Sequence, residues 1–184
     1  DRDTSTNDTC CIMASGLAGN ARITEPNADY RAFCRALNAV TTAMCRKLAA
    51  DGEGATKLIE CRVQGAKSLK DARLAAKAVV SSDLVKAAMF GADANWGRVL
   101  CALGYSGAKL DPDRIGVTFR SAAGEVAVCE NGRGIAFSEE EAKQVLSEGE
   151  IDICVSLGDG NYRATAWGCD LTYDYVKING DYRT

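Results

Sequence analysis

The chain has 184 residues, of which 47% are apolar and 26% are charged, so it is long enough to bury a hydrophobic core and has the composition of a globular protein. No window of about 18 consecutive apolar residues occurs, and we therefore expect no transmembrane helix and no membrane partner. The formal net charge of −3, from 22 basic and 25 acidic residues, predicts no nucleic-acid partner.

Histidine is absent from the sequence. Its absence removes the commonest general base and the usual metal ligand, together with every Ser-His or Cys-His nucleophile pair. The nine cysteines show no C-x-x-C spacing, and most of them fall in segments with the apolar pattern of a strand or helix. We therefore expect buried free thiols, no disulfide framework, no bound metal and no cofactor.

The first third of the chain predicts two strands separated by a long helix. The apolar run at residues 10–14 is consistent with a short buried strand. Apolar residues then recur every three to four positions over residues 27–50, which predicts an amphipathic helix capped by Asn27 and ended by Gly52. Apolar and charged residues alternate at residues 59–63, as they do in a half-buried strand.

Three further helices are predicted in the middle of the chain. Ser68 and Asp71 have the spacing of a capping box, with Asp in the position of Glu. Ser81 or Ser82 can begin a second helix. A third, short helix is expected around residues 99–103, after the Gly-punctuated segment FGADANWGR.

After Pro112 the pattern changes to short strands. Asn131-Gly132 is a strong hairpin signal, and Val117 and Phe119 alternate with polar neighbours in the strand before it. Ser138 begins a second capping box, which predicts a helix that runs to Gly149. Further strands are expected at residues 151–155, 162–167 and 171–178.

Helices mixed with several hairpins, without strict β-α-β alternation, predict an α+β fold built in layers around a mixed sheet. A soft boundary near residues 110–113 is expected where helices give way to hairpins. It divides the chain into residues 1–110, part of a layered α/β catalytic core, and residues 111–184, a smaller C-terminal α/β region.

Glu53 is the candidate functional residue that stands out from the pattern. It lies in DGEGATK, residues 51–57, between Gly52 and Gly54. Glycines let a backbone approach a ligand closely, and the carboxylate can bind an amine or transfer a proton. The alternative interpretation is a helix C-cap followed by a solvated acid, and the pattern alone favours it. The same reasoning treats the polar C-terminal run YDYVKINGDYRT as a frayed end.

Four longer segments carry more information than these patterns. They are DRDTSTNDT at the start, then DGEGATK, FGADANWGR and, at the end, ATAWGCDLTYDYVKINGDYRT. In order and together they resemble the ornithine acetyltransferase family of arginine biosynthesis, the bifunctional glutamate N-acetyltransferases. The resemblance covers essentially the whole chain. It implies part of the N-terminal-nucleophile-like DmpA/ornithine acetyltransferase fold and a precursor that cleaves itself.

This resemblance implies a ping-pong reaction in amino-acid biosynthesis. The family's β chain begins with a Thr whose hydroxyl takes the acetyl group from N-acetylornithine, releases ornithine and passes the group to glutamate, giving N-acetylglutamate. The α-amine of that Thr can act as the base for its own hydroxyl, which agrees with the absence of histidine. The resemblance places this Thr upstream of Asp1, so we expect no catalytic residue in the chain and no activity from the chain alone.

Three residues match substrate-binding positions of the family. Glu53 matches its substrate-binding Glu, Asn179 matches an Asn near the C-terminus, and Thr184 matches the terminal Ser or Thr. In this interpretation the tail folds back into the site and is not frayed. The resemblance also implies a cytoplasmic α2β2 heterotetramer, whose partners for this chain are the α chain and the missing N-terminal part of the β chain.

Two other functions remain open at this stage. Related folds with an N-terminal nucleophile cleave amides, so the chain can belong to a hydrolase in which water replaces glutamate as the acceptor. It can also be a non-catalytic fragment that binds a partner. In the second case, apolar surface normally covered by the partner should be exposed.

Overall fold

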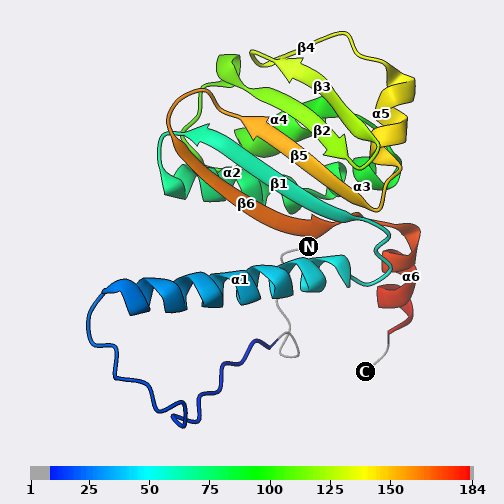
Figure 1. Ribbon diagram of the computed structural model, residues 1–184. Helices are drawn as coiled ribbons and strands as arrows, with labels where there is room; N and C mark the ends of the chain where they lie inside the picture. Colours follow the sequence, from blue (N-terminus) through cyan, green and yellow to red (C-terminus); the bar gives the residue numbers. More distant parts are fainter. Residues whose placement is uncertain (1–8, 183–184) are drawn as a thin grey trace. The chain divides into compact units, whose positions relative to one another are not determined.

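The computed structural model describes residues 9–182, in which six strands form one mixed sheet in the order β4-β3-β2-β5-β1-β6 (Figure 1). The strands are β1 (Leu58–Ala66), β2 (Gly116–Ser121), β3 (Gly124–Glu130), β4 (Arg133–Gly134), β5 (Glu150–Ser156) and β6 (Tyr162–Cys169). β1 runs parallel to β5 and antiparallel to β6, while β2 is antiparallel to both β3 and β5. The predicted α+β fold with a mixed sheet is confirmed.

The described residues form six α-helices, of which α2 and α5 cover one face of this sheet. The helices are α1 (Ala28–Ala50), α2 (Leu69–Val80), α3 (Asp83–Phe90), α4 (Trp96–Gly104), α5 (Glu139–Leu146) and α6 (Tyr173–Asp181), with a 3-10 turn at Pro112–Arg114. α2 packs on β1 and β6, α5 packs on β2 and β3, and α4 packs on α2 and α3. In Figure 1, α2, α3 and α4 lie together behind the strands.

Alternation along the central strands explains why only one face is apolar. Ile59, Cys61 and Val63 of β1 are buried, as are Phe119 of β2 and Ile153 of β5. Because successive side chains of a strand point to opposite faces, these residues share the face that the helices cover. Each of the Ile, Val and Phe side chains among them contributes about 1.5–3 kcal/mol of hydrophobic free energy when fully buried. The residues between them carry charge on the other face.

The predicted helix caps are confirmed. The Ser68 hydroxyl accepts a hydrogen bond from the Asp71 amide at 3.1 Å and begins α2. Ser82 caps α3 in the same way, and Ser138 caps α5. Each cap satisfies a backbone amide that has no partner inside its helix. Because the cap and the amide are only three residues apart, these helix starts can be predicted from the sequence.

The chain forms two compact units, Asp1–Cys45 and Arg46–Thr184. In the first, the predicted long helix is confirmed as α1, and the Asn27 side chain accepts a hydrogen bond from the Tyr30 amide at 3.0 Å. No residue from 9 to 45 is buried; Phe33 and Val40 are 60% and 57% exposed. The boundary expected near residues 110–113 stays a prediction.

Two predicted strands are wrong. Residues 10–14 are exposed and have no regular structure, because no described strand pairs with them and takes up their backbone hydrogen bonds. Residues 171–178 mostly belong to helix α6, because the Thr172 hydroxyl accepts from the Tyr175 amide and Asp174 lies in the first turn. The alternation of Tyr and other residues there imitates a strand.

The cysteines are less buried than predicted. All nine are free thiols, but only Cys61 and Cys129 are buried, while Cys10, Cys11, Cys45 and Cys101 are exposed.

No helix in residues 9–182 combines the length and apolar character needed to cross a membrane.

Candidate functional site

Strand directions bring the loop that carries Glu53 next to helix α6. Loop 51–57 leads directly into the start of β1. β6 runs antiparallel to β1, and Cys169 at its end pairs with Leu58 at the start of β1. α6 begins a few residues after Cys169. Two segments more than a hundred residues apart are therefore placed at one end of the sheet.

Glu53 and Asn179 are in direct contact at this end. The Asn179 Nδ2 donates to Glu53 Oε2 at 2.6 Å and to the carbonyl oxygen of Tyr175, one turn earlier in α6, at 3.0 Å. Both side chains are exposed. The amide N–H groups are thereby used, while the other Glu53 oxygen and the Asn179 carbonyl oxygen are acceptors that an ammonium group can reach.

Asp170 connects the loop to the end of β6. Its carboxylate accepts hydrogen bonds from the amides of Thr56 and Lys57 at 2.8 and 3.0 Å, and from the Thr56 hydroxyl at 2.5 Å. Asp170 is only 3% exposed. A buried carboxylate requires such partners, and these three bonds join it to consecutive residues of the loop.

Thr172 makes a second connection and begins α6. Its hydroxyl donates to the carbonyl oxygen of Gly54 at 2.7 Å and accepts from the Tyr175 amide. Gly54 has a φ of +68°, and a Cβ atom there would lie 2.9 Å from the Tyr175 amide nitrogen. Loop and helix approach each other too closely for any residue with a side chain at this position.

Lys57 fixes the other side of the loop. Its Nζ donates to the carbonyl oxygens of Met89 and Leu146, each at 2.7 Å. These carbonyls lie at the C-terminal ends of α3 and α5, where the helix dipole is negative. Burial lowers the pKa of Lys57, and the negative charge of Asp170 opposes this change.

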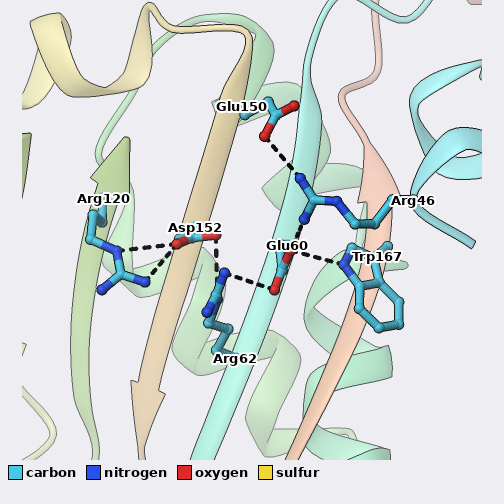
Figure 2. Close-up of polar contacts among 7 residues, drawn as sticks. All are labelled: Arg46, Glu60, Arg62, Arg120, Glu150, Asp152 and Trp167. Carbon is cyan, nitrogen blue, oxygen red and sulfur yellow. Dashed lines mark hydrogen bonds and ion pairs between the residues drawn. The ribbon is translucent and has the colours of Figure 1, made fainter. Parts of the chain in front are cut away.

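A second polar cluster lies on the sheet face opposite the core (Figure 2). Arg62 lies between Glu60, at 3.0 Å, and Asp152, at 3.5 Å. Asp152 also accepts from Arg120, at 2.7 Å. The network alternates in sign, and three strands contribute to it.

Arg46 and Trp167 complete this cluster. Arg46, in the last turns of α1, binds both Glu60 and Glu150, the latter at 2.9 Å. The Trp167 Nε1 donates to Glu60 at 2.9 Å, which further satisfies this buried carboxylate. The three arginines and three carboxylates balance in charge, so the network ties strands together and does not form a one-signed binding surface.

Two hollows in the described part of the chain border this second cluster. One, of about 430 Å³, is lined by Arg46, Arg62, Arg120 and Glu150 among others. Glu53 and Asn179 do not line it. Within residues 9–182, no group of three or more Cys, Asp or Glu side chains is arranged to hold a metal ion.

Residues 1–184, the whole chain, match the ArgJ family. The chain belongs to this family. The resemblance noted in the sequence is thus confirmed.

Relatives of this ArgJ chain are bacterial proteins described as arginine biosynthesis bifunctional proteins. The chain is 57% identical to the arginine biosynthesis bifunctional protein ArgJ of Caldanaerobacter subterraneus subsp. tengcongensis, covering 100% of this chain and 46% of that protein. It is 53% identical to ArgJ 1 of Clostridium acetobutylicum, covering 100% of this chain and 45% of that protein. The chain therefore spans a little under half the length of these curated relatives.

A solved ArgJ structure shares the fold. The crystal structure of the arginine biosynthesis bifunctional protein ArgJ from Bacillus halodurans superposes with a TM-score of 0.90 at 46% identity. The match covers 99% of this chain and 84% of the crystallised chain. The fold expected from the family resemblance is confirmed.

Of the three substrate-binding residues expected in this ArgJ chain, the structure brings Glu53 and Asn179 together. Thr184 lies outside the described residues. The sequence interpretation missed Lys57, Asp170 and Thr172. A cap signal at Thr172 was available, since Asp174 follows in the first turn, but nothing local connects Asp170 with residues 113 positions earlier.

Proposed function

We propose that this chain is the β-chain portion of an ornithine acetyltransferase of arginine biosynthesis, which moves an acetyl group from N-acetylornithine to glutamate. The contact between Glu53 and Asn179 carries the proposal. The two residues match the family's substrate-binding positions, lie 126 residues apart in the sequence, and together present acceptor oxygens to a solvent-accessible place. An amino-acid substrate with an ammonium group fits such a place.

The proposed reaction has two steps. The hydroxyl of a Thr outside this chain attacks the acetyl carbonyl, its proton passes to the Thr α-amine, and ornithine leaves with that proton. The α-amine of glutamate then attacks the carbonyl carbon of the acetyl-Thr ester. The ester C–O bond breaks, a proton from the amine returns to the Thr oxygen, and N-acetylglutamate leaves. Glu53, Asn179 and Thr184 bind and orient the amino-acid substrates, while the rest of the ArgJ polypeptide supplies the nucleophile and the oxyanion donors.

Exposed apolar residues on α1 support a partner chain in this proposal. Phe33, Val40 and Met44 recur at helical spacing and are 60%, 57% and 46% exposed. Such a stripe needs an apolar surface to pack on. In this proposal the chain works with the remaining ArgJ polypeptide in a cytoplasmic α2β2 heterotetramer and is inactive by itself.

The test compares Glu53→Ala with Glu148→Ala in a complete ArgJ protein. Glu148 is an exposed loop acid outside the proposed site. We expect Glu53→Ala to raise the KM for N-acetylornithine about tenfold and Glu148→Ala to leave it unchanged. Equal kinetics for the two variants would count against the site. Release of acetate from N-acetylornithine without N-acetylglutamate would identify a hydrolase instead.

A further inference from the structure

Glu53 and Asn179 are not held in place by burial of their own side chains. Both side chains are exposed, and α6 has no buried residue. Exposed side chains on a loop and on a terminal helix lose rotational and backbone freedom when they are held together, and their own short contact offsets little of that entropy. Other residues must hold the loop and the helix in place.

Asp170 holds both segments because of its place in the chain. It directly follows β6, so the central sheet fixes its backbone, and it precedes the Thr172 cap of α6 by two residues. Its carboxylate binds the amides of Thr56 and Lys57, and its own amide donates to the Lys57 carbonyl oxygen at 3.2 Å. One buried side chain therefore sets the separation between the loop and the start of α6.

Lys57 fixes the loop from the opposite side. Its ammonium group is occupied by the Met89 and Leu146 carbonyl oxygens, which belong to helices packed against the core. With both acceptors on the main chain of these helix ends, the ammonium group serves as an anchor for the loop. The loop is thus held between β6 and two helix ends.

We propose that Asp170 and Lys57 are positioning residues of the ArgJ site: they hold loop 51–57 and the start of α6 so that Glu53 meets Asn179, and they do not contact substrate. This inference rests on the proposed function for its kinetic consequences. Its structural part, the ordering of one loop and one helix by the contacts of Asp170 and Lys57, rests on the distances given above.

The kinetic test uses Asp170→Asn and Lys57→Met in a complete, processed ArgJ protein. Each change should raise the KM for N-acetylornithine about tenfold, since small displacements of binding groups have effects of this order or larger. Acetylation of the enzyme by p-nitrophenyl acetate, which lacks the ornithine moiety, should change less than about twofold. A KM near the wild-type value, or an equal loss with p-nitrophenyl acetate, would overturn the proposal.

Matched controls come from the other end of β1. Lys67 and Asp159 form an ion pair there, with Nζ and Oδ2 2.8 Å apart. Lys67→Met and Asp159→Asn remove the same chemical groups without touching loop 51–57. Both should keep the wild-type KM; an increase equal to that of the site variants would overturn the assignment of a local role.

Hydrogen exchange separates failure of this inference from failure of the proposed function. In Asp170→Asn, backbone amides of residues 51–57 and of α6 should exchange faster, while those of β5 keep their protection. Faster exchange over the whole sheet, or no change in the loop, would overturn the positioning role. If the wild-type protein transfers no acetyl group, the proposed function fails, and the exchange pattern alone then decides the positioning role.

Discussion

Glu60 on β1 and Asp152 on β5 face each other directly across the parallel strand pair, and Arg62 binds both carboxylates. Like charges in directly opposed positions destabilise a sheet. Arg62 converts this unfavourable pair into an alternating row that continues through Arg120 and Arg46 (Figure 2). The charged face therefore reinforces the pairing that the apolar face requires.

Removing the central arginine should expose the repulsion. We expect Arg62→Leu to lower the free energy of unfolding by about 1 kcal/mol, because Glu60 and Asp152 then face each other with fewer cations. Arg73→Leu, at an exposed position of α2, is the control. Urea denaturation measures both. Equal stability of the two variants would show that the row contributes nothing to the sheet.

Asp71, in the first turn of α2, predicts a dependence of stability on pH. Hydrogen bonds from the Ser68 hydroxyl and from the Lys109 amide hold the pKa of Asp71 below its ordinary value of 3.8. Since the folded pKa is depressed, the stabilisation is present above pH 3.8 and is lost as the pH falls below that value. Asp71→Asn should therefore be less stable than wild type at neutral pH, and the difference should shrink in acid. Unfolding curves above and below pH 3.8 measure this difference. A difference in unfolding free energy between the two proteins that does not change with pH would contradict the prediction.

Two glycines with a similar backbone conformation allow the cost of backbone strain to be distinguished from the cost of a steric clash with α6. Gly54 and Gly107 have φ values of +68° and +74°, but a Cβ atom at Gly54 meets Asp174 and Tyr175 while one at Gly107 meets nothing within 4 Å. Alanine at either site should cost about 1–2 kcal/mol of backbone strain. Gly54→Ala should in addition displace α6 and weaken substrate binding. Equal effects of the two substitutions on the free energy of unfolding and on KM would show that the close approach of loop and helix at Gly54 contributes nothing.

Thiol accessibility offers a direct check on packing. Burial raises the pKa of the Cys61 and Cys129 thiols, whereas Cys101 is exposed on α4. Because the thiolate is the reactive form, native protein treated with iodoacetamide should be alkylated at Cys101 well before Cys61 or Cys129. Peptide mapping by mass spectrometry reports the order, and early labelling of Cys61 would contradict the buried core.

Local signals in the sequence predicted much of the fold. Ser68, Ser82 and Ser138 identified helix starts because a hydroxyl that accepts from the third amide is a short-range interaction. Alternation at residues 59–63 identified β1 for a similar reason. The same local approach assigned a strand to residues 10–14, where no described strand pairs, and missed the cap at Thr172.

By itself the sequence determined the α+β class, most element boundaries and the ArgJ family. Only the tertiary structure decided that Glu53 and Asn179 meet, that Asp170 and Lys57 hold the loop between them, and that most cysteines are not buried. The physical reason is distance along the chain. Caps and alternation act within a few residues, whereas the site depends on β6 returning antiparallel to β1 and placing α6 beside a loop more than a hundred residues earlier.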